Sequence, residues 1–407
     1  MKGVLVILDG VADLPVKQLN DKTPLEVADT PNLNFLANRG DLGLMNSVKP
    51  GFAPGSDEAI VSIFGNDLHS SSRGQLEVRG TDINLVRGDL ALRANFATID
   101  SLETGRIIDR RAGRTLTTKE AEILAKEINK IEMPCKFVFK NTIQHRGVLV
   151  FRGGLSDDIS GNDPPSSQNI KPIKALDEND STYYTVNIIN EFLEKVFNAL
   201  DKHPINEKRR QRGLMPANYL LIRGAGIESP KLRFYRNWVA VSYMPLEIGF
   251  AKTSGMKVVS FKYPKQKKLD VYENLQKGLK KACKVSIKAI KRNYKKFDYA
   301  YIHIKETDLP GHDNKPFEKK AMIEHIDKTL FNFLKKFAPS KKIKVVVTAD
   351  HSTPCRLKDH SSDPVPVLYY PADDRGPKEK RFTEREARVG TLGRIVGGEL
   401  FKVVGFS

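Results

Sequence analysis

Three aspartates lie just beyond the ends of three short apolar runs. In chain order the pairs are Val4–Leu8 with Asp9, Tyr299–Ile304 with Asp308, and Lys344–Thr348 with Asp350. The runs are rich in Val, Ile and Tyr without clean polar alternation, which is typical of parallel strands covered on both faces. The carboxyl ends of parallel strands share one sheet edge, where ligands bind. We therefore expect three neighbouring carboxylates, which repel each other unless a cation neutralises them.

Three histidines follow two of these aspartates closely, in a chain that has 8 histidines. They are His312, His351 and His360. A single aspartate at a strand end is usually a helix N-cap, and a single histidine is usually an ordinary surface or core residue. The combination favours another interpretation, because a dinuclear metal site satisfies all six carboxylate and imidazole groups at once.

A serine that could act as a nucleophile lies in the turn Pro54–Ala59, just before a short apolar segment with a helical pattern. One interpretation makes Ser56 a helix N-cap, with Asp57 and Glu58 in the first turn. The other makes Ser56 a nucleophile whose alkoxide is stabilised by helix amides and a metal. The turn alone leaves both interpretations open.

The elements that position these residues predict two domains. Apolar runs, including a fourth at Val365–Tyr370, alternate with helical patterns at 269–297 and 317–337, which indicates a layered α/β domain. The stretch 75–235 differs: it contains a helical pattern at 118–131, a strand-like segment at 147–151, a polar loop at 153–169 and another helical pattern near 186–200. We therefore predict a core domain formed by residues 1–74 and 236–407, interrupted by an inserted α+β domain at 75–235.

Composition excludes several classes of protein. The chain has 407 residues and a net charge of +18. No apolar stretch is long enough for a transmembrane helix, and the first apolar run resembles a strand rather than a signal peptide, so we expect a cytoplasmic protein. The 3 cysteines suggest neither a disulfide framework nor a zinc site. Many lysines lie on a helical stretch, Lys265–Lys296, that is poor in aromatic residues, which disfavours nucleic-acid binding as the reason for the charge.

The order of these elements resembles the alkaline phosphatase superfamily, and the finer matches resemble its archaeal-type cofactor-independent phosphoglycerate mutases. Two matching strings are long and specific, Asp109–Arg114 (DRRAGR) and Asp350–Pro354 (DHSTP). Shorter matches, such as Arg93–Thr98, Arg223–Gly226 and His303–Lys305, run nearly end to end. The resemblance implies an alkaline-phosphatase-like α/β/α core with a mostly parallel sheet, plus an inserted α+β domain that binds substrate and acts as a lid.

The resemblance also implies a metal centre and a nucleophile. One divalent ion would be held by Asp308, His312 and His360. The other would be held by Asp9, Asp350, His351 and the oxygen of Ser56. Mn²⁺ is favoured, with Mg²⁺, Co²⁺ and Zn²⁺ as alternatives. Ser56 would take the phosphoryl group of 3-phosphoglycerate and return it to the 2-hydroxyl, so that no bisphosphoglycerate is required.

The small-molecule substrate carries a phosphate and a carboxylate, both of which suit the guanidinium fork. The candidate substrate-binding residues are Asn95, Arg110, Arg111, Arg114, His145, Arg146, Arg223 and Lys305, and Asp109 is a candidate acid/base. Alternatively, these are ordinary surface residues of a basic protein, and Lys305 only balances local negative charge. The chain departs from the family at 162–165, where Asp-Pro-His is expected and Asn-Asp-Pro-Pro stands.

Two other functions stay open at this stage. A metal-dependent phosphatase or phosphodiesterase would use the same ligands and release free phosphate. A basic nucleic-acid-associated protein would leave the aspartates and histidines unexplained. The sequence makes no prediction about the oligomeric state.

Overall fold

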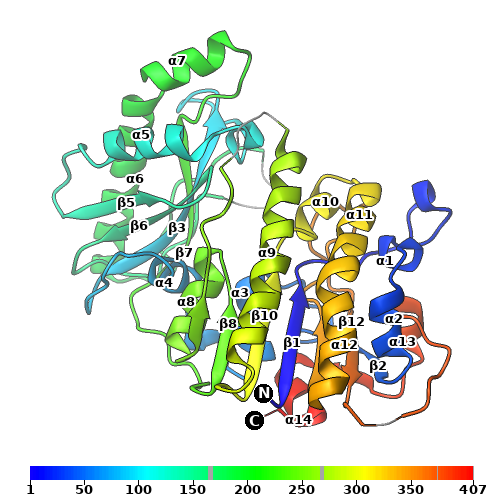
Figure 1. The fold of residues 1–407 in the computed structure, drawn as a ribbon. Helices are drawn as coiled ribbons and strands as arrows, with labels where there is room; N and C mark the ends of the chain where they lie inside the picture. The colour runs from blue at the N-terminus through cyan, green and yellow to red at the C-terminus, as the bar shows by residue number, and fades with distance from the viewer. Residues whose placement is uncertain (164–167, 266–269, 374, 407) are drawn as a thin grey trace.

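Two sheets, each with its own hydrophobic core, divide the molecule into two lobes (Figure 1). This computed structural model describes residues 1–163, 168–265, 270–373 and 375–406. No helix in these ranges is both long enough and apolar enough to cross a bilayer. The cytoplasmic location stays a prediction.

The larger lobe contains an eight-stranded sheet in the order β13-β2-β12-β11-β1-β10-β8-β9. Its strands are β1 (Gly3–Leu8), β2 (Asp41–Asn46), β8 (Trp238–Val241), β9 (Lys257–Val259), β10 (Tyr299–Ile304), β11 (Lys344–Thr348), β12 (Val365–Tyr370) and β13 (Gly393–Val396). β1 pairs in parallel with β10 and β11, whereas β12 runs antiparallel to both its neighbours. The prediction of a mostly parallel sheet is therefore confirmed.

Helices cover both faces of this sheet, as a layered α/β/α core requires (Figure 1). They are α1 (Pro24–Val27), α2 (Pro31–Ala37), α3 (Ser56–Ile63), α8 (Pro245–Thr253), α9 (Val271–Asn293), α10 (Asp308–His312), α11 (Pro316–Ile326), α12 (Asn332–Lys341), α13 (Glu384–Arg388) and α14 (Leu400–Val404), with a π-helical turn at Asp327–Phe331 and 3-10 turns at Lys17–Leu19, Leu68–Ser70 and Gly397–Glu399. α9 forms because its apolar stripe, including Leu279, Ala282 and Ile290, is buried against the core while its lysines stay exposed.

The smaller lobe is an antiparallel five-stranded sheet with helices packed against it. Its strands are β3 (Leu90–Ile99), β4 (Ile107–Asp109), β5 (Phe137–Asn141), β6 (Arg146–Phe151) and β7 (Tyr219–Gly226), and its helices are α5 (Thr118–Ile128), α6 (Asp180–Leu200) and α7 (Pro204–Gln211). β3 is central, because β4, β6 and β7 all pair with it. The predicted α+β insertion is confirmed as an architecture.

One helix, α4 (Arg73–Arg79), lies at the junction of the two lobes. It packs on α8 backbone to backbone: a Cβ added to Gly249 would lie 1.8 Å from the carbonyl oxygen of Leu76, and one added to Gly80 would lie 1.8 Å from that of Pro245. α4 also contacts β3 and β7 of the smaller sheet. Because the predicted boundary at residue 75 falls inside this helix, the division into 1–74 plus 236–407 and 75–235 stays a prediction.

Candidate active site

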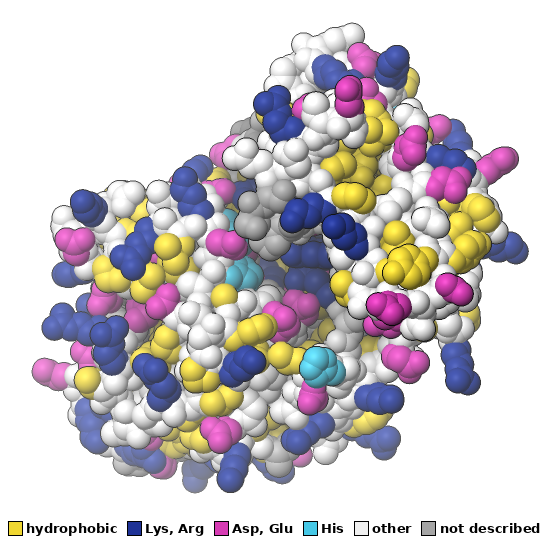
Figure 2. Space-filling view, turned by 180° about the vertical axis from the view of Figure 1, so that it is seen from behind, with side chains coloured by type: hydrophobic (Ala, Val, Ile, Leu, Met, Phe, Trp, Pro, Cys, Tyr) yellow, Lys and Arg dark blue, Asp and Glu magenta, His cyan; other side chains and the backbone are white. Residues whose placement is uncertain are grey.

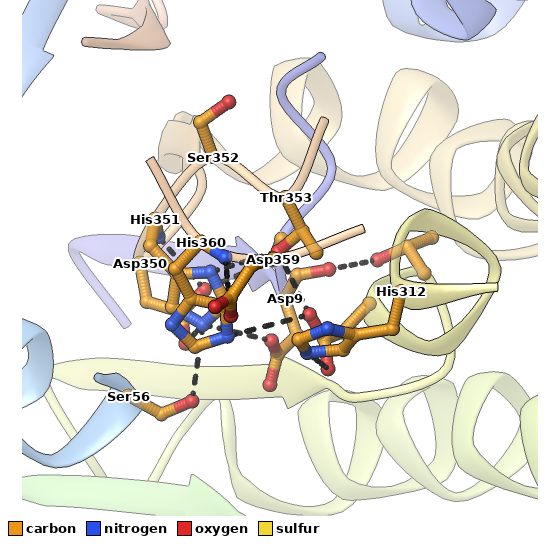
Figure 3. A network of polar contacts seen from close by, with 12 residues as sticks. Asp9, Ser56, His312, Asp350, His351, Ser352, Thr353, Asp359 and His360 are labelled. Carbon is orange, nitrogen blue, oxygen red and sulfur yellow. Dashed lines mark hydrogen bonds and ion pairs between the residues drawn. The ribbon is translucent and has the colours of Figure 1, made fainter. Parts of the chain in front are cut away.

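The three predicted strand-end aspartates lie together at one edge of the larger sheet, and Figure 3 shows two of them, Asp9 and Asp350. Asp9 directly follows β1, Asp308 begins α10 just after β10, and Asp350 follows β11. These three strands are parallel neighbours, so their carboxyl ends bring the carboxylates to the same place. The three histidines join them, so that the structure brings together all six predicted Asp and His groups.

Asp308, His312 and His360 form one group whose potential ligand atoms all lie within 4.8 Å of one another. The Nε2 of His312 lies 3.4 Å from Oδ2 of Asp308, and the Nε2 of His360 lies 3.8 Å from Oδ1. Each ring points its Nδ1 at a backbone carbonyl, of Lys358 at 3.0 Å and of Pro54 at 2.8 Å. A carbonyl can only accept, so Nδ1 carries the hydrogen and Nε2 presents a lone pair, as metal-ligating histidines do.

Asp9, Asp350 and His351 lie beside the first group. The Nε2 of His351 is 3.3 Å from Oδ1 of Asp9 and 3.4 Å from Oδ2 of Asp350. Its Nδ1 lies 3.0 Å from Oγ1 of Thr353, which donates its own hydrogen to Asp308, so Nδ1–H is again the donor. In the described chain, Oδ1 of Asp9 and Oδ2 of Asp350 are buried without a hydrogen bond, whereas Oδ2 of Asp9 pairs with the ammonium of Lys305. Carboxylates that face imidazole lone pairs fit divalent cations bound between them.

The pKa values of the histidines support this fit. Burial, with the neighbouring His351, lowers the pKa of His360 to about 4, and burial also lowers the pKa of His351. Both rings are therefore neutral near pH 7, which ligation requires. His312 differs: burial opposes its protonation, but the carboxylate of Asp308 outweighs burial and raises its pKa.

The ends of β1, β10 and β11, with the cluster that they carry, are called the metal edge below; the cluster is Asp9, Asp308, Asp350, His312, His351 and His360. His303 also lies beside this metal edge, although no role was predicted for it. It lies on β10 and is fully buried, with Nε2 3.4 Å from both Oδ2 of Asp9 and Oδ2 of Asp350. The hydroxyl of Tyr301 lies 2.8 Å from its Nδ1. With Asp9 and Asp350 it forms a further group that could hold a metal. Its place within the His303–Lys305 string was the available signal, but a histidine inside an apolar strand resembles a core residue.

Ser56 is the first residue of α3, and the N-cap is Gly55. The carboxylate of Glu58 accepts a bond from the Gly55 amide at 2.8 Å. The Ser56 hydroxyl, freed from capping, lies 3.2 Å from Nε2 of His351 and accepts a 3.2 Å bond from Nζ of Lys305. Of the two interpretations of this turn, the capping one does not describe the contacts of Ser56.

Lys305 lies at the metal edge rather than in the insertion. Its ammonium pairs with Asp9 and lies 2.9 Å from a carboxylate oxygen of Glu247. Burial lowers the pKa of Lys305 and raises that of Glu247. The predicted balancing of negative charge is present, and the ammonium also reaches Ser56.

Lys319 cross-links the loops that carry the metal-edge aspartates, and the sequence analysis did not find it. Its ammonium is fully buried and donates to Oδ2 of Asp13 at 2.7 Å and to the backbone oxygens of Thr353 and Ala12 at 2.9 and 3.3 Å. These bonds join the loop after β1 to the loop after β11. A lysine on an amphipathic helix resembles a solvated residue, so the sequence carried no signal for this role.

The string Asp109–Arg114 forms a left-handed turn at the end of β4. Ala112, Gly113 and Arg114 have φ values of 47°, 65° and 54°. Such a conformation costs about 1–3 kcal/mol for each non-glycine residue, so surrounding bonds must hold it. Oδ1 of Asp109 supplies two of them, accepting from the amides of Arg111 at 2.7 Å and Gly113 at 2.8 Å. Asp109 therefore shapes the turn, whereas its acid/base role stays a prediction.

A cavity of about 690 Å³ lies between this turn and the metal edge. Asp109, Arg110, Arg111 and Arg114 line one wall, and the opposite wall includes His312, Asp313 and Lys358. Figure 2 shows the hollow between the two lobes, with basic side chains gathered in it. Arg114 also pairs with Asp313 across the cavity, and Tyr272 donates a 2.7 Å bond to the same carboxylate. The predicted arginines of the turn therefore share a cavity with His312, one of the predicted metal ligands.

The other predicted substrate-binding residues lie on the smaller sheet, outside the described lining of this cavity. Asn95 pairs in register with Arg146 on β3 and β6, and His145 precedes Arg146. Burial, followed by Arg146 and Arg111, lowers the pKa of His145 far below its usual range. Arg223 on β7 pairs with Arg93 on β3, and burial with Arg73 lowers the Arg223 pKa to about 10.

Arg110 forms an ion pair with Asp163, at the start of the loop that departs from the family pattern. Pro164 and Pro165 of that loop lie outside the described residues. Two further charged residues at the junction, the half-buried Arg73 and the buried Glu77, were not predicted. Arg73 pairs with Asp57 at 2.7 Å and with Glu77 at 2.8 Å.

Comparisons with known proteins find relatives that match nearly the whole chain. The family model for 2,3-bisphosphoglycerate-independent phosphoglycerate mutase matches residues 37–206. A protein of that name from Pyrococcus furiosus is 40% identical over 411 aligned positions, which cover 99% of this chain and 96% of the relative. A solved structure from Pyrococcus horikoshii superposes with a TM-score of 0.74 at 32% identity, covering 100% of this chain and 98% of the other. The cofactor-independent phosphoglycerate mutase from Thermoplasma acidophilum gives 0.57 at 30% identity, covering 100% and 99%.

Proposed function

Because the chain belongs to the 2,3-bisphosphoglycerate-independent phosphoglycerate mutase family, we propose that it interconverts 3-phosphoglycerate and 2-phosphoglycerate through a phosphoserine at Ser56. It is an isomerase by this reaction. One observation carries the assignment of roles: arginines of the insertion and a histidine of the metal edge line the same cavity. An anionic substrate in that cavity can contact both.

The metal edge prepares the nucleophile. Two divalent ions, for which we propose Mn²⁺, would be held by Asp308, His312 and His360 and by Asp9, Asp350, His351 and Ser56. When bound, such ions stabilise an ionised hydroxyl and the oxygens of a phosphate. The Lys305 ammonium adds positive charge at the Ser56 oxygen. The first amides of α3 point toward the same place and favour an anion there.

The reaction moves one phosphoryl group and one proton in two steps. In the first, the bond from Ser56 Oγ to phosphorus forms and the bond to the 3-oxygen breaks, and the 3-oxygen takes up a proton. In the second, the 2-hydroxyl of glycerate loses its proton, the bond from the 2-oxygen to phosphorus forms, and the bond from phosphorus to Ser56 Oγ breaks, which returns Ser56 to its ionised form. We propose Asp109 for these proton transfers, through Oδ2, the oxygen that does not hold the turn.

The arginine turn keeps glycerate in place between the two steps. Arg111 and Arg114 can bind the carboxylate of glycerate while the phosphoryl group stays on Ser56. Burial, followed by the charges of Arg114 and Arg146, lowers the Arg111 pKa to about 10, so Arg111 remains a cation near pH 7. We propose that the same anion is supported by Arg110, which lines the same cavity, and by Arg146, Arg223, His145 and Asn95 on or beside the strands of the smaller sheet. Closure of the insertion would exclude water, which otherwise hydrolyses the phosphoserine.

A coupled assay tests this function directly. Conversion of 3-phosphoglycerate is followed through enolase with Mn²⁺ present and bisphosphoglycerate absent, while free phosphate is measured in the same samples. We expect 2-phosphoglycerate without a matching release of phosphate. Release of phosphate without 2-phosphoglycerate would identify a hydrolase and overturn the proposal.

A further inference from the structure

We propose that Arg209 is a positioning residue for substrate binding, because it holds the left-handed turn that presents Arg111 and Arg114 to the cavity. Arg209 lies on α7, near the far end of the insertion, and belongs to none of the motifs identified in the sequence. The inference rests on the proposed function, since it assigns substrate binding to the arginines of this turn.

The guanidinium of Arg209 is 1% exposed, and it makes five hydrogen bonds. The acceptors are the carbonyl oxygens of Met215 at 2.8 Å, Thr115 at 3.3 Å and Ala112 at 3.3 Å, Oγ1 of Thr115 at 2.8 Å, and Oε2 of Glu120 at 3.2 Å. A guanidinium has five N–H donors, so this side chain is fully used. Three of its acceptors belong to Ala112, the first left-handed residue of the turn, and to Thr115, which follows the last one.

The turn needs such a clamp because its backbone is unfavourable in isolation. Ala112 and Arg114 both have positive φ, which side chains with a Cβ rarely adopt. Asp109 accepts from the amides of Arg111 and Gly113, and Arg209 donates to the carbonyl oxygens of Ala112 and Thr115. Together the two side chains hold the backbone of the turn from Arg111 to Thr115, and so determine where Arg111 and Arg114 point.

The fork of Arg209 is required, and its positive charge alone is insufficient. Glu120 is the carboxylate with which it pairs, and the same Oε2 also accepts from the amide and hydroxyl of Thr117 at the start of α5. A lysine at position 209 would keep the charge but offer three donors on a flexible stem, which cannot reproduce the planar arrangement. Arg209→Lys is therefore the informative substitution.

Arg210 offers a matched control on the same helix. It is about one third exposed and pairs with Asp201 and Glu207, and in the described chain it makes no bond to the turn. We expect Arg209→Lys to raise the KM for 3-phosphoglycerate at least tenfold, with a smaller change in kcat. Arg210→Lys should leave both parameters within twofold of the unchanged enzyme.

Binding and stability readouts separate positioning from a merely structural role. Binding of 3-phosphoglycerate is measured by calorimetry on the metal-loaded enzyme carrying Ser56→Ala, with and without Arg209→Lys, well below the melting temperature of each. We expect at least tenfold weaker binding. A variant that melts earlier but binds normally would overturn the proposal, as would equal defects in Arg210→Lys.

Two further variants keep the test decisive. If Arg209→Lys does not fold, Thr115→Val removes one acceptor of the clamp and should raise KM about threefold; an unchanged KM there would overturn the proposal.

In a double-mutant cycle, Asp109→Asn and Arg209→Lys should have non-additive effects on KM, because both act on one turn. If the parent enzyme has no mutase activity, the proposed function fails first, whereas normal activity with normal binding in all variants rejects only the role of Arg209.

Discussion

The metal edge and the arginine turn are built on different kinds of backbone. The metal edge continues three parallel strands, and the pairing of β1 with β10 and β11 fixes where its carboxylates lie. The arginine turn is an irregular segment with positive φ, and bonds from Asp109 and Arg209 fix its shape. A sheet distributes the positioning of a residue over many bonds, whereas a turn depends on a few. The substrate half of the site should therefore be the more sensitive to changes at a distance.

Removal of the nucleophile should have the largest effect. We expect Ser56→Ala to reduce mutase activity about 10⁴-fold or more, because Ser56 is the hydroxyl that contacts both His351 and Lys305 at the start of α3. The measurement is kcat in the enolase-coupled assay, together with mass spectrometry of the acid-quenched enzyme for phosphoserine. Ser62→Ala on the same helix is the control. Retained activity in Ser56→Ala would show that Ser56 is not the nucleophile.

Removal of the bound metal should lower activity almost as strongly as removal of the nucleophile. A chelator should lower activity about 10³-fold or more and also lower the melting temperature, because less positive charge then offsets the mutual repulsion of the buried carboxylates of Asp9 and Asp350. Added Mn²⁺ should restore both. Activity and the melting temperature are followed as functions of free Mn²⁺. An enzyme that stays fully active after exhaustive chelation, with metal content checked by mass spectrometry, would contradict the assignment.

A substitution at the contact between the arginine turn and the larger lobe should have a moderate effect on the products of the reaction. Asp313 pairs with Arg114 of the turn and accepts a bond from Tyr272, so it ties the insertion to the core. We expect Asp313→Asn to loosen this contact and to raise the ratio of released phosphate to 2-phosphoglycerate about fivefold, since water reaches the phosphoserine more often. Both products are measured in one reaction.

Asp298→Asn serves as the control for this substitution, because Asp298 pairs with Lys2 near the chain start, away from the cavity. An unchanged ratio in Asp313→Asn would show that closure does not depend on the contact between Asp313 and Arg114.

The smallest effect concerns pH and stability at Glu384, which lies on α13 and contacts Asp13 in the loop after β1. Burial raises the pKa of Glu384 to about 7, above its ordinary 4.5, although Thr23 and the amide of Asp13 donate to it. The folded protein therefore binds this proton more tightly than the unfolded chain. Glu384 contributes stability that is fully present below pH 4.5 and is lost as pH rises through 7.

Glu384→Gln should remove this part of the pH dependence, about 1–2 kcal/mol between pH 5 and 8, because Glu384 is partly exposed and the shift is screened. Denaturant unfolding at several pH values measures it, with Glu386→Gln as the control. A pH dependence identical to that of the unchanged protein would contradict the prediction.

Sequence reasoning located the metal edge because strand ends are visible in a sequence. An apolar run followed by an aspartate predicts a strand with a carboxylate at its end. Parallel pairing of three such strands then brings the three carboxylates to one edge of the sheet. The same reasoning did not identify His303. A histidine within an apolar strand has no spacing that distinguishes a residue of the site from an ordinary core residue.

The arginine turn was only partly predictable. The residue types of Asp109–Arg114 indicated anion binding, but nothing in the string shows that Ala112 and Arg114 adopt positive φ or that Asp109 caps the turn. Arg209 is nearly a hundred residues further along the chain, within a run of basic residues that resembles a solvated helix end. Its burial depends on tertiary packing, which periodicity does not reveal. For the same reason, Lys319 could not be distinguished from the exposed lysines near it.

The chain order of the two sheets has a consequence for biosynthesis. All strands of the smaller sheet lie within residues 90–226, so this lobe can fold as soon as that segment leaves the ribosome. The central strand of the larger sheet behaves differently, because Gly3 of β1 pairs with Tyr299 and Lys344. Until those late strands emerge, β1 has unpaired edges that can aggregate. The smaller lobe would thus fold before the last predicted ligands of the metal edge have been synthesised. Truncated chains should therefore accumulate with a folded smaller lobe and an incompletely folded larger lobe.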